Sequence, residues 1–209
     1  MRIHLIGKTG RMGQAIQRLH PEIVSIESAE VIVDFSHPDQ LEKTLELAQK
    51  FRIPLVVGTT GFTETQHLAL AKTGSVIPLL HSPNFSLGIA LCKQLTAILT
   101  KALPTASRVV VEAHHRLKKD RPSGTALALA MAAGDAEILS IRGGSIVGEH
   151  TIRFIADGEQ IELKHLAEDR NCFAKGALDV AQWLIDKPPK LYKMEEYAIS
   201  LFGIREQPG

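Results

Sequence analysis

The sequence predicts an α/β fold, in which a parallel-sheet domain is followed by a smaller α+β domain with a mixed sheet. In the first half of the 209-residue chain, short β-branched and aliphatic runs alternate with longer segments of helical period, which is the pattern of βαβ units. From Arg108 onward, strand-like segments follow one another and include a hairpin signal. Such succession favours antiparallel or mixed pairing.

The first half contains four candidate strands, at residues 2–7, 31–35, 54–58 and 75–80. Between the second and third, Pro38 can occupy the first turn of a helix, since its missing N–H is not needed there. Apolar or small residues then recur on one helical face at Leu41, Thr44, Leu45, Ala48 and Phe51. This periodicity predicts a crossover helix. Further helices are expected over 61–72 and over 87–103, which precedes Pro104.

The second half predicts a strand over 108–115, an alanine-rich helix over 123–133, and half-buried strands over 149–155 and 160–165. The last two strands are separated by Ala156, Asp157, Gly158 and Glu159. Asp-Gly between alternating segments is a strong hairpin signal. A last amphipathic helix is expected over 174–185, before Pro188 and Pro189.

The composition is that of an ordinary globular protein, with 44% hydrophobic and 22% charged residues. A net charge of +1 argues against a surface built for nucleic acid, so any anion must be bound locally. The two cysteines, Cys92 and Cys172, have no CxxC spacing and are interpreted as reduced thiols. The N-terminus has frequent polar residues, which predicts neither a signal peptide nor a membrane span. We therefore expect a cytoplasmic protein without membrane association.

A glycine-rich loop follows the first predicted strand, and a helix is expected to begin within it. Its residues are Gly7, Lys8, Thr9, Gly10, Arg11, Met12 and Gly13, spaced as G-x-x-G-x-x-G. Glycines let a backbone turn tightly and approach a pyrophosphate, whose charge suits the N–H groups of a helix N-terminus. The loop favours dinucleotide binding, and an ordinary strand-to-helix turn is the alternative.

Two further turns stand at the carboxyl ends of predicted strands, where open α/β sheets bind ligands. The first contains Gly58, Thr59, Thr60 and Gly61, and the second contains Ser82, Pro83, Asn84 and Phe85. The second turn can present backbone and amide groups to a nicotinamide carboxamide. Ordinary loop chemistry is an equally good interpretation of either turn alone.

The most informative segment runs from Glu112 to Ala126, between a predicted strand and a predicted helix. It gathers six basic or titratable side chains, His114, His115, Arg116, Lys118, Lys119 and Arg121. It ends with Ser123, Gly124 and Thr125 at the expected helix N-terminus. Charge-assisted hydrogen bonds and free N–H groups there suit a carboxylate, and histidine and lysine can also donate protons.

This segment has three other interpretations. A basic run is usually a solvated surface. Adjacent histidines could suggest a metal, but neighbours on a strand point to opposite faces, and no cysteine or carboxylate cluster completes a site in the sequence; no metal is expected. Nucleic acid would call for aromatic side chains among the basic ones, and the segment has none.

Taken together, these motifs resemble the 4-hydroxy-tetrahydrodipicolinate reductase (dihydrodipicolinate reductase) family of the lysine pathway. The resemblance extends over nearly the whole chain. It rests on residues 7–13, 33–36, 57–61, 83–86 and 112–126, and continues through 142–144, 148–150, 162–165, Arg170, 173–174 and 176–178.

The resemblance implies a Rossmann-like dinucleotide-binding domain over 1–85 and 171–209, and a substrate-binding and tetramerisation domain over 86–170. NADPH or NADH would bind to Gly7–Met12, Gly58–Thr60 and Ser82–Phe85. His114 would donate or accept a proton, Lys118 would donate one, and His115, Gly124 and Thr125 would bind the dicarboxylate substrate. The implied enzyme is a homotetrameric oxidoreductase of diaminopimelate and lysine biosynthesis.

One departure from the family concerns the region after the glycine loop. Only residues 14–29 separate this loop from the strand at Val31, too few for a helix, a second strand and its connection. In Rossmann-like domains a residue after the second strand reads the adenosine ribose, so the preference between NADH and NADPH stays open. Glu27 is a possible substitute ligand, and a solvated carboxylate is the alternative.

Two alternative functions also stay open at this point. The shortened cofactor domain is compatible with a non-catalytic dinucleotide or anion sensor. The glycine loops alone are compatible with another nicotinamide oxidoreductase that acts on a small carboxylic acid.

Overall fold

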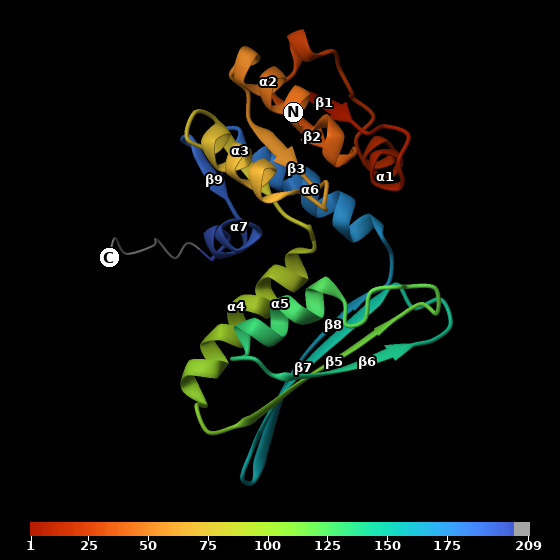
Figure 1. The fold of residues 1–209 in the computed structure, drawn as a ribbon, viewed down its shortest axis with the longest axis vertical. Coiled ribbons are helices and arrows are strands. Elements are labelled where there is room, and N and C mark those ends of the chain that lie inside the picture. Colours follow the sequence, from red (N-terminus) through yellow and green to blue (C-terminus); the bar gives the residue numbers. More distant parts are fainter. Residues whose placement is uncertain (203–209) are drawn as a thin grey trace. The chain divides into compact units, whose positions relative to one another are not determined.

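The computed structural model describes residues 1–202, which form two compact units (Figure 1). Unit 1 contains Met1–Leu87 together with the segment from Asn171 onward, and unit 2 contains Gly88–Arg170. Within residues 1–202, none of the helices combines the length and the apolar character that crossing a membrane requires.

Unit 1 is built on a five-stranded parallel sheet in the order β1-β2-β3-β4-β9. The strands are β1 (Ile3–Ile6), β2 (Val31–Asp34), β3 (Leu55–Val57), β4 (Pro78–His81) and β9 (Lys190–Tyr192). The four strands expected in this half are therefore present, and their carboxyl ends share one edge of the sheet.

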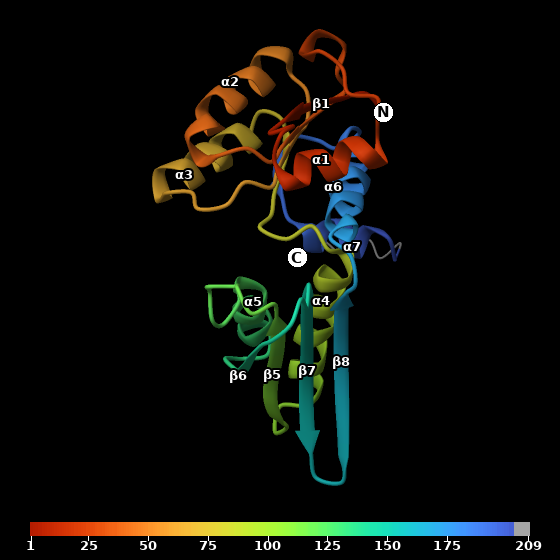
Figure 2. The same ribbon diagram turned by 90° about the vertical axis from the view of Figure 1, so that its right-hand side faces the viewer.

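Helices cover both faces of this sheet (Figure 2). One face carries α2 (Leu41–Phe51) and α3 (Glu64–Gly74), and the other carries α1 (Arg11–Leu19) and α6 (Asn171–Leu184). The short helix α7 (Met194–Ser200) packs on α6. On the α2 and α3 side, a core of buried aliphatic side chains includes Ile32, Leu45, Leu55 and Leu79. This arrangement confirms the Rossmann-like α/β prediction.

On the outer edge of β1, the chain pairs at a single point and forms no further strand within residues 1–202. Ile23 forms one isolated parallel bridge with Ile3, and the N–H of Val24 donates to the carbonyl of Ile3 at 2.9 Å. A 3-10 turn (Ile26–Ser28) follows, after which the chain enters β2. Within the described residues, β1 is thus the edge strand of the sheet.

Unit 2 is a four-stranded mixed sheet in the order β6-β5-β7-β8. Its strands are β5 (Ser107–His114), β6 (Glu137–Arg142), β7 (Gly148–Ala156) and β8 (Glu159–Ala167). The pair β5 and β6 is parallel, and the other pairs are antiparallel. The mixed sheet and the Asp-Gly hairpin between β7 and β8 were both predicted.

Two helices, α4 (Leu87–Ala102) and α5 (Gly124–Ala132), pack on one face of this sheet. The core between them contains Val110, Leu129, Ile152 and Phe154. The opposite face has no covering element among the described residues of unit 2. Large apolar side chains remain about half exposed on that face, namely Leu139, Ile141, Ile155 and Leu166.

Some elements differ from the expectation. Strand β4 begins at Pro78 and not at Ser75, because the N–H groups of Ser75 and Ile77 still donate to Ala71 and Thr73 of α3. Helix α6 begins three residues earlier than expected, at Asn171. The short elements β6, β9 and α7 were not predicted.

Candidate functional site

The glycine loop of unit 1 is fixed by close backbone packing. Gly7 has φ +86°, and a Cβ there would lie 2.4 Å from the carbonyl oxygen of Phe35. A Cβ on Gly13 would lie 2.1 Å from the carbonyl oxygen of Gly7. Both positions therefore exclude side chains. Helix α1 begins at Arg11 with no acidic residue in its first turn, so its N-terminus keeps the partial positive charge that attracts a phosphate.

The two other predicted turns lie at the same edge of the sheet. The N–H of Gly58 donates to the carbonyl of Asp34 at 2.8 Å, and the N–H of Ser82 donates to the carbonyl of Val57 at 3.1 Å. Each turn is thus tied to the strand beside it. The turn after β4 is shaped further by its own side chains, because the Ser82 hydroxyl donates to the Asn84 carbonyl at 2.6 Å.

Two buried or half-buried aromatic rings underlie these turns. Phe35 and Phe85 form an edge-to-face pair with ring centroids 5.3 Å apart. The Thr59 hydroxyl is buried and has no hydrogen-bond partner within the described residues. Because a buried hydroxyl normally has a partner, this atom fits a ligand group. Glycine turns, a helix N-terminus and this hydroxyl together fit a dinucleotide such as NADPH or NADH.

Glu27 does not lie at the end of the unit 1 sheet where the carboxyl ends of the strands and the glycine loop meet. Its carboxylate interacts with its own backbone and Ser25 first, which lowers its pKa, and more weakly with the charges of His4 and Lys50. Lys50 is in the last turn of α2, which leads to the amino end of β3. Glu27 therefore lies toward the end of the sheet opposite to the glycine loop.

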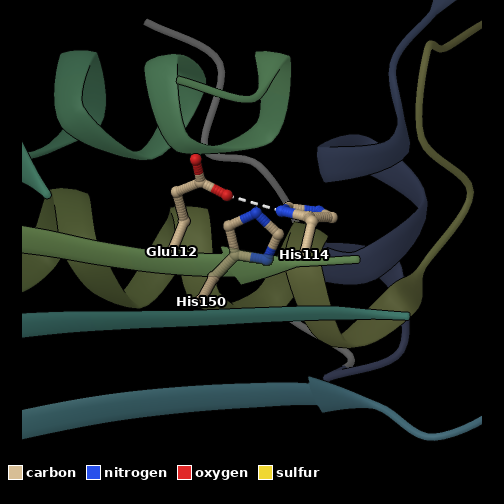
Figure 3. Close-up of side chains that lie close together, drawn as sticks. All are labelled: Glu112, His114 and His150. Atoms are coloured by element: carbon tan, nitrogen blue, oxygen red, sulfur yellow. Dashed lines mark hydrogen bonds and ion pairs between the residues drawn. The ribbon is translucent and has the colours of Figure 1, made fainter. Parts of the chain in front are cut away.

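Unit 2 contains a buried cluster of titratable side chains at one end of its sheet (Figure 3). Glu112 and His114 are two residues apart on β5, so both side chains lie on the face that α5 covers. His114 Nδ1 lies 2.5 Å from Glu112 Oε2. His150 on β7 is directly opposite Glu112 in the sheet, and its ring packs edge-to-face on that of His114.

Arg142 of β6 completes the surroundings of Glu112. Its Nη2 donates to Glu112 Oε1 at 2.7 Å and to the carbonyl of Asp120 at 2.7 Å. Burial alone would raise the pKa of Glu112, but hydrogen bonds from Arg142, Ser140 and His114 outweigh it and bring the pKa to about 2. Glu112 is therefore a carboxylate at neutral pH, although its side chain is fully buried.

The two histidines of the cluster are held largely neutral. Burial lowers the pKa of His114, and the Glu112 carboxylate opposes this shift. Burial and the neighbouring His114 bring the pKa of His150 to about 4. The Nε2 atom of His150 lies 3.1 Å from the hydroxyl of Ser123, which also caps α5 by accepting from the N–H of Ala126.

Lys118 and the start of α5 border this cluster. Lys118 Nζ lies 2.8 Å from a carboxylate oxygen of Asp120, and the lysine side chain is 23% exposed. Gly124 and Thr125 form the first turn of α5, which contains no acidic residue. A Cβ on Gly124 would meet nothing within 4 Å. There is therefore open space beside Gly124, and the N–H groups of this first turn suit an anion.

The same cluster has the composition of a metal site, since one ligand atom each of Glu112, His114 and His150 lie within 4.8 Å of one another. The sequence interpretation did not foresee this carboxylate. However, Arg142 already occupies one oxygen of Glu112, and His114 Nδ1 occupies the other. A guanidinium so close to the carboxylate opposes a divalent cation, so the arrangement is better suited to holding a proton.

The structure thus brings the predicted His114, Lys118, Gly124 and Thr125 into one region of unit 2, with half-buried His115 next in the chain. The predicted cofactor residues gather at one edge of unit 1. Sequence reasoning missed Glu112, Arg142 and His150 as members of the cluster. The spacing of Glu112 and His114 on a strand was a usable signal, whereas Arg142 and His150 come from neighbouring strands.

Comparisons with known proteins agree with this picture. Residues 20–85 match the family model described as dihydrodipicolinate reductase, N-terminus, and residues 88–197 match the model of its C-terminus. A 4-hydroxy-tetrahydrodipicolinate reductase of Rickettsia bellii is 37% identical, covering 96% of each chain. One of Thermosipho africanus is 38% identical, covering 94% of this chain and 97% of the relative.

The alignments also bear on the length of the chain. The alignment with the R. bellii protein spans 239 positions, more than the 209 residues of this chain, so it contains gaps in this chain. The alignment with the T. africanus protein needs only 210 positions to cover 97% of that relative, which is therefore comparably short.

Among solved structures, the dipicolinate-bound dihydrodipicolinate reductase from Paenisporosarcina sp. TG-14 has a TM-score of 0.82 at 20% identity. It covers 94% of this chain and 98% of its own, so the two share a fold. With the family models and the relatives above 30% identity, the conclusion is that this chain belongs to the dihydrodipicolinate reductase family.

Proposed function

We propose how the two units share the reaction of this enzyme. The chain is an NAD(P)H-dependent oxidoreductase that reduces 4-hydroxy-tetrahydrodipicolinate to tetrahydrodipicolinate in the diaminopimelate and lysine pathway. The overall reaction consumes a hydride and a proton and releases the hydroxyl group as water. Unit 1 binds the cofactor, and unit 2 binds the substrate and supplies the proton.

The cofactor is bound by Gly7–Met12, Gly58–Thr60 and Ser82–Phe85. The N-terminus of α1 holds the pyrophosphate, for which the small Gly10 leaves room. The turn shaped by Ser82 and Asn84 holds the nicotinamide end. NADPH or NADH, when bound there, supplies the hydride.

His114 and Lys118 are the proton-transferring groups. His114 Nδ1 is occupied by Glu112, so Nε2 is the atom that accepts or donates a proton. Lys118 Nζ lies 2.8 Å from a carboxylate oxygen of Asp120 and is partly exposed, and its ammonium group is the proton donor to the reduced ring. The observation that carries this assignment is the buried Glu112–His114 pair beside a lysine and an open helix N-terminus.

The substrate carboxylates are bound by His115, Gly124 and Thr125. The first N–H groups of an α-helix have no partners within the helix and favour anions. The Paenisporosarcina relative is bound to dipicolinate, a dicarboxylate of this kind.

The open face of the unit 2 sheet supports assembly into a homotetramer. Leu139, Ile141, Ile155 and Leu166 are 42–51% exposed there, and the same face carries the ion pairs Arg153–Glu162 and Lys164–Glu149. Exposed apolar side chains with polar neighbours are typical of a subunit interface. We place the enzyme in the cytoplasm, where cysteines outside disulfides, such as Cys92 and Cys172, stay reduced.

An assay of purified protein tests the proposal. The unstable cyclic substrate is generated in place by the preceding synthase, and the absorbance of NADPH or NADH is followed. We expect oxidation that depends on the substrate. Cofactor binding without turnover would favour a sensor, and turnover with other small acids but not with this substrate would favour another oxidoreductase.

A further inference from the structure

We propose that Glu112 is a positioning residue that acts through His114, by holding its imidazole with a proton on Nδ1 and so presenting Nε2 to the substrate. The inference rests on the proposed role of His114 and names the group that controls it. Neither the family resemblance nor the motif residues assigned such a role to Glu112.

The direction of the hydrogen bond follows from the chemistry of its partners. A carboxylate can only accept, so His114 Nδ1 must be the donor across the 2.5 Å contact. In its neutral form His114 then carries its one proton on Nδ1, and Nε2 is free to act as a base. A second proton on Nε2 would convert the same ring to an acid.

Glu112 itself has no freedom to turn away. Its side chain is fully buried, and its other oxygen accepts from Arg142 at 2.7 Å. Arg142 also donates to the carbonyl of Asp120, the residue whose carboxylate pairs with Lys118. One guanidinium thus fixes the carboxylate behind His114 and the loop that carries Lys118.

The opposite nitrogen of His114 faces a glycine. A Cβ built on Gly148 of β7 would lie 3.2 Å from His114 Nε2, closer than most carbon contacts. The missing side chain leaves Nε2 accessible from that side. Glu112 on Nδ1 and Gly148 beside Nε2 therefore give the ring two distinct sides, one buried in the protein and one available to a ligand.

Burial lowers the pKa of His114, and the charged groups that face the ring modify this shift. Glu112 favours the protonated ring, whereas Lys118 and Arg142 disfavour it, and His150 packs against it from β7. Replacing Glu112 by glutamine removes the favourable charge and leaves Arg142 unneutralised. The pKa of His114 should fall, and any limb of the pH profile that requires protonated His114 should move to lower pH.

The experiment compares wild type, Glu112→Gln, His114→Ala and the double variant, with the exposed Glu159→Gln as a matched control. For Glu112→Gln we expect kcat to fall by about 10²- to 10⁴-fold, as when an amide replaces the carboxylate behind a catalytic histidine, with little change in KM. The double variant should be no slower than His114→Ala, because Glu112 acts only through His114. Additive losses, or a pH profile that does not move, would overturn the inference.

A second measurement does not depend on activity. In ¹⁵N-labelled protein, the imidazole shifts of His114, assigned with His114→Ala, report which nitrogen carries the proton. The Nδ1-protonated form supports the inference, and the Nε2-protonated form refutes it even if Glu112→Gln fails to fold. If the wild type proves inactive on the substrate, the proposed function fails and the tautomer measurement still stands. Loss of activity on chelation that Zn²⁺ restores would show that the cluster binds a metal and would also overturn the inference.

Discussion

The candidate sites of the two units use different chemical groups, namely backbone in unit 1 and side chains in unit 2. In unit 1 the predicted cofactor loops present mostly backbone, and their defining residues are glycines packed against a carbonyl, such as Gly7 on Phe35. In unit 2 the chemistry resides in side chains that fix one another, from Arg142 through Glu112 to His114. The comparison teaches that binding a common cofactor needs shape, whereas transferring a proton needs a controlled network of charges.

The largest expected effect is a loss of kcat that leaves cofactor binding unchanged. His114→Ala and Lys118→Ala should each lower kcat by about 10²- to 10⁴-fold, the usual worth of a general acid or base. Binding of NADPH, measured by fluorescence titration, should stay within twofold of wild type, because the cofactor loops belong to unit 1. The exposed Lys101→Ala serves as the control. A comparable loss of cofactor affinity in the two catalytic variants would break the distinction.

Gly7→Ala and Gly10→Ala form a matched pair within the glycine loop. Alanine at position 7 must adopt φ +86° and would clash with Phe35, so we expect a loss of about 1–3 kcal/mol in stability and of cofactor binding. Gly10 has φ −73°, and its Cβ would meet nothing closer than 3.4 Å.

Gly10→Ala should therefore leave the thermal midpoint unchanged, while it weakens cofactor binding on the order of tenfold, or about 1.4 kcal/mol, because the methyl group takes up room meant for a phosphate. Thermal unfolding and fluorescence titration check both variants. Unchanged affinity in Gly10→Ala would indicate an ordinary strand-to-helix turn.

His150 should make the protein sensitive to acid. Its pKa is about 4 in the folded protein, chiefly because of burial, and about 6.5 in the unfolded chain. Between these values the unfolded chain binds more protons, so the free energy of unfolding decreases as the pH falls. From pH 7 to pH 5 this amounts to about 2 kcal/mol.

We expect His150→Gln to remove most of this decrease, as measured by urea unfolding at the two pH values. The exposed His37→Gln should retain it. Glu112 affects stability at lower pH. Its contribution to the free energy of unfolding is lost as the pH falls from about 4.5 toward its pKa of about 2. An unchanged pH dependence in His150→Gln would mean that His150 is already protonated in the folded protein.

The smallest effect concerns Glu27. Because its charged neighbours are His4 and Lys50 and not the glycine loop, we expect Glu27→Gln to leave the KM for both NADH and NADPH within twofold of wild type. Steady-state titration of each cofactor checks this. A preference for NADH that disappears in the variant would show that Glu27 binds the adenosine ribose.

Much of the fold followed from the sequence, because the strands of both units are short aliphatic runs bounded by clear turns. The exceptions have local causes. β6 alternates exposed and half-buried residues but lies between a helix and a glycine turn, without a hairpin partner in sequence. β9 has three residues, fewer than a period-two pattern needs to be recognised.

The candidate site was predictable only where it is local in sequence. The glycine loop and the segment from His114 to Thr125 are continuous, so their residue types could be interpreted together. Arg142 and His150 reach Glu112 through β-sheet pairing with β6 and β7. No spacing in the chain reveals which residue of a neighbouring strand will lie opposite another, so this part of the network required the structure.

The single bridge between Ile3 and Ile23 has a practical consequence for engineering. Among residues 1–202, no strand pairs with the outer edge of β1 beyond this bridge, so this edge has backbone groups to which an added strand can pair. A strand and helix grafted in place of residues 20–30 would extend the sheet at this edge and add a residue that binds the adenosine ribose after the added strand, as in Rossmann-like domains. We therefore expect an added strand, and not a point substitution, to change the coenzyme preference of this protein.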